Sequence, residues 1–449
     1  MSDFTYRDGE LFAEDAALTA IAARFGTPCY VYSRAMLEAA YREYDEALAS
    51  RPPLAGQLPL AGQSHPAAQS HRAGQSLAGQ AHVDAQRHLI CYALKANSNL
   101  AILNVLARLG SGFDIVSGGE LARVLAAGGD AGKVVFSGVG KSEAEMEAAL
   151  TAGILCFNVE SSSELQTLAR VAARMGKHAP VSFRVNPDVD PGTHPYISTG
   201  LSQSKFGVPF ATARELYARA AQLPAIRVQG IDLHIGSQIT SLAPYREAVA
   251  KVLELVDALA ASGLALEHID VGGGLGIRYR DENPVPIAAY AALLAELFAG
   301  RRERLVVEPG RRLVGPAGVL LTRVTYLKPG TTHSFAVVDA AMNDLIRPAL
   351  YGAWHPMLPV RPHGGTARSW QIVGPICESG DFLAEDRELA LEEGDLLAIG
   401  AAGAYGFVMS SNYNSRPRAA EVMVSGASAV EVRARESVTS LFAGESLLP

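Results

Sequence analysis

The chain has 449 residues, of which 49% are hydrophobic and 19% charged, and its formal net charge is −7 at pH 7. This length allows one large domain and a second one, and the composition is that of a globular protein, neither disordered nor fibrous. The negative charge disfavours nucleic acid and anionic membranes as partners. No apolar run reaches membrane-spanning length, and the N-terminus lacks the pattern of a signal peptide. Because the four cysteines are scattered without a C-x-x-C pair, we expect reduced thiols and a cytoplasmic protein.

The first part of the chain combines a short helix near Glu14–Phe25, a strand at Pro28–Tyr32 and a helix from the N-cap Ser33 to Leu48. Residues 51–86 then form degenerate repeats built around Leu-Ala-Gly-Gln. Such a stretch carries too little bulky apolar surface to offset the entropy of ordering it, so we predict a disordered surface insertion. The stretch contains His65, His71 and His82, and His88 follows it. Their spacing matches no usual metal site, so no metal is predicted.

From Leu89 onwards, strand-like and helical patterns alternate regularly. The expected strands are Ile90–Lys95, Phe113–Val116, Val134–Ser137, Leu155–Val159, Val181–Asn186, Gly230–Ile235, His268–Val271 and Leu305–Glu308. The expected helices between them include Asn99–Leu109, Gly119–Ala127, Ser142–Ala152, Ser162–Met175, Ala213–Gln222, Pro244–Ala261 and Pro286–Ala299. Eight such repeats predict a (β/α)8 barrel, although an open doubly wound sheet would give a similar pattern.

After Arg311 the pattern changes to short strands broken by Gly, Pro and Asp, which indicates a mostly β second domain of the sandwich or barrel kind. The expected strands are Leu313–Tyr326, Ser334–Asp339, Ser369–Val373, Leu389–Leu391, Asp395–Ile399 and Ala420–Val424. We therefore expect residues 34–311 to form the α/β barrel and residues 312–449 the β domain. Residues 1–33 are expected to join the β domain through the strand near Tyr30.

Several unusual residues stand where predicted barrel strands end, and in a barrel these ends converge on one face that carries the chemistry. Lys95 ends the first strand, His234 lies near the end of the sixth, Gly272–Gly274 follow the seventh, and Glu308 ends the eighth. A buried primary amine suits Schiff-base chemistry, because desolvation is expected to lower the pKa of Lys95 and free its lone pair. Taken alone, Lys95 would also suit a solvated charge capping a strand.

Together these groups match the requirements of pyridoxal phosphate. This cofactor needs an amine for its aldehyde, N–H donors for its phosphate and a carboxylate that keeps its ring nitrogen protonated. Lys95 and Glu308 supply the amine and the carboxylate, and His234 can lie against the ring. The glycine run lacks the last glycine of a dinucleotide fingerprint, since Ile277 stands there, but its backbone amides can approach a phosphate.

Longer motifs carry a resemblance to a known family. Those typical of the fold type III pyridoxal-phosphate decarboxylases are Tyr92–Asn97, His234–Gln238, Gly272–Gly274 and Glu308–Arg311. Further motifs resemble the diaminopimelate decarboxylase branch of that family: Gly112–Leu121, His194–Gly200, Leu345–Tyr351, Cys377–Asp381 and Ala402–Gly406. The resemblance covers nearly the whole chain except the repeat insertion.

The resemblance implies a homodimer whose active sites are shared between subunits. It implies that Lys95 binds the cofactor aldehyde, that Glu308 faces the ring nitrogen, and that Cys377 acts as general acid from the second subunit. It places at the cofactor His234, Ser237, Gly272, Gly273, Gly274, Pro309, Gly310, Arg311 and Tyr405. It places at the distal end of the substrate Arg311, Arg347, Tyr351, Glu378 and Tyr405.

The implied reaction is decarboxylation of meso-2,6-diaminopimelate to L-lysine and carbon dioxide, the last step of lysine biosynthesis by this route. Two arginines suit a distal carboxylate, and Glu378 suits a distal ammonium, so together they favour a substrate with an amino acid group at each end. The alternatives are a related decarboxylase acting on carboxynorspermidine or a basic amino acid, an amino-acid racemase, or a catalytically silent cofactor-binding homologue.

Overall fold

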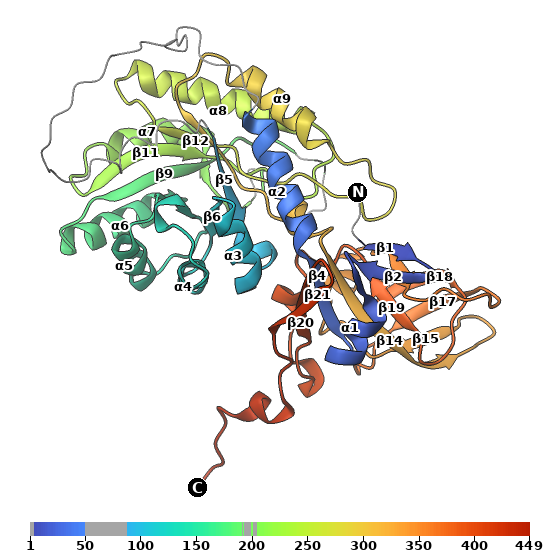
Figure 1. The fold of residues 1–449 in the computed structure, drawn as a ribbon. Coiled ribbons are helices and arrows are strands. Elements are labelled where there is room, and N and C mark those ends of the chain that lie inside the picture. The colour runs from blue at the N-terminus through green and yellow to red at the C-terminus, as the bar shows by residue number, and fades with distance from the viewer. Residues whose placement is uncertain (1–3, 50–87, 191, 193–198, 201–203) are drawn as a thin grey trace, which may run out of the picture.

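The computed structural model describes residues 4–49, 88–190, 192, 199–200 and 204–449. The repeat insertion expected at 51–86 lies outside the described residues. Figure 1 shows a barrel surrounded by helices, with a mostly β part beside it that contains both the N-terminal strands and the strands from β14 (Gly318–Lys328) onwards. In the described part of the chain, no helix combines the length and apolarity needed to cross a bilayer.

The barrel is a parallel sheet that closes on itself, which confirms the predicted fold class. Its strands are β5 (His88–Ala93), β6 (Gly112–Ile115), β7 (Val134–Phe136), β8 (Cys156–Val159), β9 (Ala179–Asn186), β11 (Ile226–Asp232), β12 (His268–Asp270) and β13 (Arg304–Val307). Each pairs with the next in parallel, β8 pairs with β9, and β13 pairs with β5 to close the ring. A short strand, β10 (Val208–Pro209), is appended to β9.

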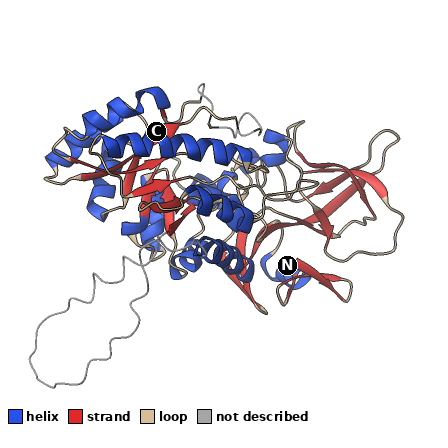
Figure 2. Ribbon diagram, turned by 90° about the horizontal axis from the view of Figure 1, so that it is seen from above, coloured by secondary structure: helices blue, strands red, loops and turns tan. Residues whose placement is uncertain are grey.

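Helices cover the outside of this ring (Figure 2). They are α2 (Arg34–Ala49), α3 (Leu100–Arg108), α4 (Gly118–Ala126), α5 (Glu143–Ala152), α6 (Ser162–Arg174), α7 (Phe210–Ala220), α8 (Ala243–Ala261) and α9 (Ile287–Leu297). Several begin at a polar N-cap: the side chains of Asn99, Ser117, Ser142 and Ser161 each accept a hydrogen bond from a first-turn amide, which satisfies a donor that the helix leaves unpaired. The Ser33 hydroxyl likewise accepts from the amide of Met36 at the start of α2.

The second part is built around β14 (Gly318–Lys328). Its other strands are β4 (Cys29–Ser33), β15 (Phe335–Val338), β16 (Met357–Pro359), β17 (Arg368–Val373), β18 (Phe382–Leu389), β19 (Leu396–Ile399), β20 (Ala420–Ser425) and β21 (Ser428–Arg433). From the N-terminal segment, β4 pairs antiparallel with β14 and parallel with β20. The boundaries expected after residues 33 and 311 stay predictions.

Among the differences between the structure and the expected elements are three short segments. The N-terminus forms a small sheet of β1 (Phe4–Arg7), β2 (Glu10–Ala13) and β3 (Ala16–Ala17), so helix α1 (Leu18–Phe25) begins later than Glu14. The run expected as a strand from Leu313 starts as the short helix α10 (Arg311–Val314). Of the strand expected at Leu389–Leu391, only Leu389 lies in a strand, as the last residue of β18. Short elements of this kind are decided by tertiary pairing and are poorly marked in a local pattern.

Candidate active site

A cavity of about 490 Å³ contains Lys95 and residues from several strand ends of the barrel. It is lined by Lys95, Val116, Ser137, Gly138, Val139, Gly140, Arg184, Thr199, Phe206, His234, Ser237, Arg311, Arg347, Tyr351, Tyr405 and Met409. A narrow extension of about 30 Å³ reaches Gly274, Glu308, Pro309 and Gly310. The cavity thus brings together most of the residues that the resemblance assigns to the site.

Lys95 follows β5 in a short 3-10 turn, Leu94–Ala96. Its Nζ lies 2.6 Å from Oδ2 of Asp114 on β6, whose side chain is fully buried. Burial alone would lower the pKa of Lys95, but the facing carboxylates of Asp114 and Glu308 raise it above its usual value. The expectation of a lowered pKa for Lys95 is therefore wrong in this structure, because its carboxylate neighbours outweigh burial.

Three acidic side chains meet at the narrow extension of the cavity, which one of them, Glu308, lines. Carboxylate oxygens of Asp232, Asp270 and Glu308 lie within 4.8 Å of one another. Each residue is at most 4% exposed, and each keeps one buried oxygen without a hydrogen-bond partner among the described residues. Burial raises the pKa of Asp232 to about 7, and burial with the neighbouring carboxylates raises those of Asp270 and Glu308 well above their usual values. We interpret the cluster as carboxyl groups that share protons, since like charges this close cannot all ionise.

His234 is a neutral imidazole beside the glycine loop. Burial, with the positive charges of Arg184 and Lys95, holds the pKa of His234 well below its usual value. Its Nδ1 accepts a hydrogen bond of 3.2 Å from the amide of Gly273. The amide of Gly272 donates to Asp270, so these two amides are already engaged with protein groups. A Cβ at Gly273 would collide with the carbonyl oxygen of Glu308, which explains the glycine by close packing.

Arg311 and Arg347 project into the cavity from α10 and from α11 (Arg347–Tyr351). They are 5% and 7% exposed, respectively. Arg311 donates to the Tyr279 hydroxyl at 2.6 Å and to the Ser237 hydroxyl at 3.2 Å. Within the described residues neither guanidinium forms an ion pair with a carboxylate. Buried cations without an anionic partner are costly, so the pair is prepared for an anionic ligand.

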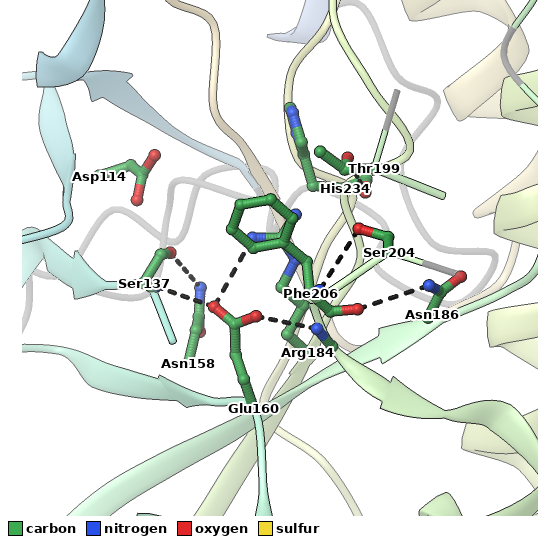
Figure 3. A network of polar contacts seen from close by, with 12 residues as sticks. Asp114, Ser137, Asn158, Glu160, Arg184, Asn186, Thr199, Ser204, Phe206 and His234 are labelled. Atoms are coloured by element: carbon green, nitrogen blue, oxygen red, sulfur yellow. Dashed lines mark hydrogen bonds and ion pairs between the residues drawn. The ribbon is translucent and has the colours of Figure 1, made fainter. Parts of the chain in front are cut away.

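A polar network supports one wall of the cavity (Figure 3). Glu160 accepts hydrogen bonds from the amides of Gly138 and Gly207, and it lies 3.7 Å from Arg184. The Arg184 guanidinium in turn lies over the ring of Phe206, 4.8 Å from its centroid. The network joins the loops that follow β7 and β9 and fixes three residues that line the cavity, Gly138, Arg184 and Phe206.

The motif expected at His194–Gly200 is described only at its end, because residues 194–198 lie outside the described residues. Thr199, which lines the cavity, donates from its hydroxyl to the backbone oxygen of His234 at 2.8 Å. This bond ties the motif to the segment that follows β11 and carries the imidazole.

Cys377 and Glu378 are exposed and are absent from the described residues that line the cavity. The Cys377 amide donates to Asn414 Oδ1 at 2.8 Å, and the Glu378 carboxylate accepts from the Tyr413 hydroxyl at 3.2 Å. Their loop is therefore held by the segment around Asn414, whose backbone adopts a positive φ of 55°. Within one chain, these two predicted site residues stay apart from Lys95.

The residues present fit pyridoxal phosphate. Lys95 offers an amine and His234 a neutral ring. Oε1 of Glu308, which has no hydrogen-bond partner in the described part of the chain, offers a site for a ring nitrogen in the narrow extension. Ser237, Gly310 and Tyr405 line the same extension beside Arg311. Their individual roles stay predictions.

Sequence reasoning missed several residues of this site, chiefly Asp232, Asp270, Arg184 and Tyr279, and also His355, which contacts Arg347 behind the cavity wall. Asp232 stands two positions before His234, and Asp270 stands two before Gly272. Because alternate residues of a strand face the same side, these spacings are a signal that could have indicated them.

Comparison with known proteins agrees with this geometry. The family model "Pyridoxal-dependent decarboxylase, pyridoxal binding domain" matches residues 71–315. The diaminopimelate decarboxylase of Pseudomonas fluorescens is 58% identical over all of both chains. Among solved structures, diaminopimelate decarboxylase from Helicobacter pylori complexed with L-lysine has a TM-score of 0.84 and 38% identity, covering 95% of this chain and 98% of that one. The enzyme from M. jannaschi has a TM-score of 0.88 and 34% identity, covering 100% and 99%. The chain belongs to the diaminopimelate decarboxylase family of pyridoxal-dependent decarboxylases.

Proposed function

We propose that the protein decarboxylates meso-2,6-diaminopimelate to L-lysine and carbon dioxide with pyridoxal phosphate, in the cytoplasm. The observation that carries the substrate assignment is the pair Arg311 and Arg347, two buried guanidiniums without a carboxylate partner among the described residues, in the same cavity as Lys95. A substrate with a second amino acid group supplies the missing carboxylate. The full-length similarity to diaminopimelate decarboxylases supports the same reaction. Four free cysteines suit a reducing compartment.

The cofactor would be held at both of its ends. Lys95 would hold the aldehyde end covalently, and Glu308 would face the ring nitrogen. Ser237, Gly274 and Tyr405 would surround the phosphate. When bound, pyridoxal phosphate supplies an electron sink for the pair released as the carboxylate leaves.

Lys95 must lose a proton before its amine can form a bond. Oδ2 of Asp114, at 2.6 Å from Nζ, is the acceptor in place for that proton. Asp114 is buried, and its Oδ1 has no hydrogen-bond partner among the described residues. Its carboxyl group can therefore take a proton, and the contact that changes is the one with Lys95.

The distal end of the substrate would meet both arginines. A carboxylate can accept two parallel N–H bonds from a guanidinium, and this geometry is specific as well as strong. Tyr351 lines the same part of the cavity. A decarboxylase for ornithine or arginine would have no distal carboxylate to place there.

The reaction also needs an acid that delivers a proton to the carbon that has lost its carboxylate. We assign this role to Cys377 of the partner subunit in a homodimer, with Glu378 of the partner subunit binding the distal ammonium. The exposure of both residues, away from the cavity of their own chain, supports a site completed by a second copy.

The decisive experiment follows the purified holoenzyme. Its bound-cofactor absorbance should change when meso-diaminopimelate is added, and carbon dioxide and L-lysine should form. L-Ornithine and D-lysine serve as comparison substrates and should release much less carbon dioxide. Faster turnover of either, or no carbon dioxide from meso-diaminopimelate, would reject the proposal.

A further inference from the structure

His355 contacts one of the two cavity arginines without lining the cavity itself. It lies after α11, it is fully buried, and its Nε2 is 3.4 Å from Nε of Arg347. We infer that His355 is a positioning residue that orients the guanidinium of Arg347 without neutralising it, and so sets the affinity for ligands with a distal carboxylate. This inference deepens the proposed function and rests on it.

The hydrogen bonds of His355 define its tautomer. Nδ1 lies 2.9 Å from the carbonyl oxygen of Gly400, which can only accept, so Nδ1 carries the hydrogen. Nε2 then carries a lone pair, which accepts the hydrogen bond from the Nε–H of Arg347. Burial lowers the pKa of His355 to about 3, and the positive charge of Arg347 acts in the same direction. The imidazole is therefore a neutral acceptor throughout the physiological pH range.

A neutral acceptor has a definite consequence for the arginine. An aspartate or glutamate in this place would form an ion pair with Arg347 and compete with the ligand for its charge. The imidazole engages only Nε, which leaves the two terminal nitrogens of the guanidinium for a carboxylate. The partners of Arg311 follow the same rule, since they are the hydroxyls of Tyr279 and Ser237.

Tyr279 links the two arginine supports. Its ring meets the imidazole of His355 edge to face, with centroids 5.1 Å apart and an angle of 76°. The Arg347 guanidinium lies 5.2 Å from the centre of the same ring. Because the Tyr279 hydroxyl accepts from Arg311, a single tyrosine contacts both guanidiniums and the imidazole. The relative placement of the two cations is thus fixed by uncharged groups.

Two substitutions separate the two bonds of His355. In His355→Asn, the short amide can still donate to Gly400 but cannot reach Arg347. In His355→Gln, the longer amide can place its oxygen near the position of Nε2 and accept from Arg347. His178→Asn is the matched control, because His178 is exposed and directly precedes β9 at the end of the barrel opposite the strand ends of the site.

The measurement compares two ligands of the holoenzyme, L-lysine and 1,5-diaminopentane. Both carry a terminal amine on a five-carbon chain, and only L-lysine has the distal carboxylate. We expect His355→Asn to weaken inhibition by L-lysine about tenfold more than inhibition by 1,5-diaminopentane, as for the loss of one oriented charge-assisted contact. The KM for meso-diaminopimelate should rise by a similar factor while kcat changes less. His355→Gln should stay within about threefold of the wild type, and His178→Asn should match it.

The outcomes separate the two claims. Equal weakening of both ligands in His355→Asn would show a merely structural role and overturn the inference, with the decarboxylation itself intact. Absence of carbon dioxide release by the wild type would overturn the proposed function and the inference with it. If His355→Asn does not retain the cofactor, the test uses the ratio of the inhibition constants of L-lysine and 1,5-diaminopentane in His355→Gln. A ratio equal to that of the wild type supports the inference. A lower selectivity for L-lysine contradicts it.

Discussion

Nζ of Lys95 and Oδ2 of Asp114 are 2.6 Å apart, and the carboxylate is fully buried whereas the lysine side chain is 36% exposed. An ion pair of this kind keeps the amine protonated, and a protonated amine is unreactive as a nucleophile. In the proposed function, attachment of the cofactor to Lys95 requires the proton to leave Nζ, and Asp114 is the group in contact with that proton.

Replacing Asp114 by Asn should make Lys95 easier to deprotonate. Because the carboxylate raises the pKa of Lys95, its removal lowers that pKa, and the amine becomes available at lower pH. The pH profile for recombination of apoenzyme with pyridoxal phosphate, followed by absorbance, should move to lower pH by about one unit or more. An unchanged profile would show that Asp114 does not govern this proton.

Cys377→Ala should retain the bound-cofactor absorbance but lose turnover by about 10²–10⁴-fold, the usual contribution of a general acid. The cysteine is exposed and donates only its backbone amide to Asn414, so truncation of the thiol should leave folding intact. Steady-state carbon dioxide release measures the effect. A loss below about threefold would remove Cys377 from the acid role.

Mixing two inactive variants tests the shared site. In a mixed dimer of Lys95→Ala and Cys377→Ala chains, one site has both mutations and the other has neither. After subunit exchange, activity should return to about one quarter of the wild-type level, because half of the dimers are mixed and each has one intact site. Each variant incubated alone is the control, and no recovery despite proven exchange would place both residues in one chain's site.

Asp232→Asn should change how the stability of the apoenzyme depends on pH. The folded-state pKa of Asp232 is about 7, above its ordinary value near 4, so the folded chain binds more protons than the unfolded chain between these values. Stability from this group is therefore lost as the pH rises through that window. The difference in thermal stability between Asp232→Asn and the wild type should therefore shift in favour of the variant as the pH rises from 5 to 8.

Thermal midpoints at the two pH values, without cofactor, measure this difference. Asp8→Asn is the matched control, because Asp8 is exposed and its positive φ of 48° suits asparagine equally well. A parallel pH dependence in Asp232→Asn and the wild type would show that Asp232 is ionised in the folded protein.

Deletion of residues 52–86 should leave KM and kcat nearly unchanged. Helix α2 ends at Ala49 and strand β5 begins at His88, so the insertion joins the chain at the start of a barrel strand. The chemistry lies at the opposite ends of the strands. Steady-state kinetics of the deletion variant check this, and a large loss of turnover would contradict the placement.

The local sequence was sufficient to predict the barrel and much of the site. Continuous apolar runs separated by helical periods mark buried parallel strands, and in a parallel barrel their ends must meet. Lys95, His234 and Glu308 could therefore be assigned to one face from their positions alone. The closed parallel sheet of the structure confirms the fold class predicted in this way.

Other parts of the site had a weaker local signal. Asp232 and Asp270 are the last residues of β11 and β12, and only their two-residue spacing to His234 and Gly272 marks them. The local pattern does not distinguish a buried carboxyl group there from a solvated strand-end charge. His355 and Tyr279 lie far apart in the chain, in irregular segments, and only the packing of α11 against the barrel loops brings them to the two arginines.

The sequence by itself thus determined which chemical groups stand at the strand ends and hence the kind of cofactor that they suit. Tertiary structure alone decided their protonation states and partners. The pKa of Lys95 illustrates the reason: burial and an opposing carboxylate act in opposite directions, and their balance depends on a distance of 2.6 Å between residues on different strands. No pattern along the chain contains that distance.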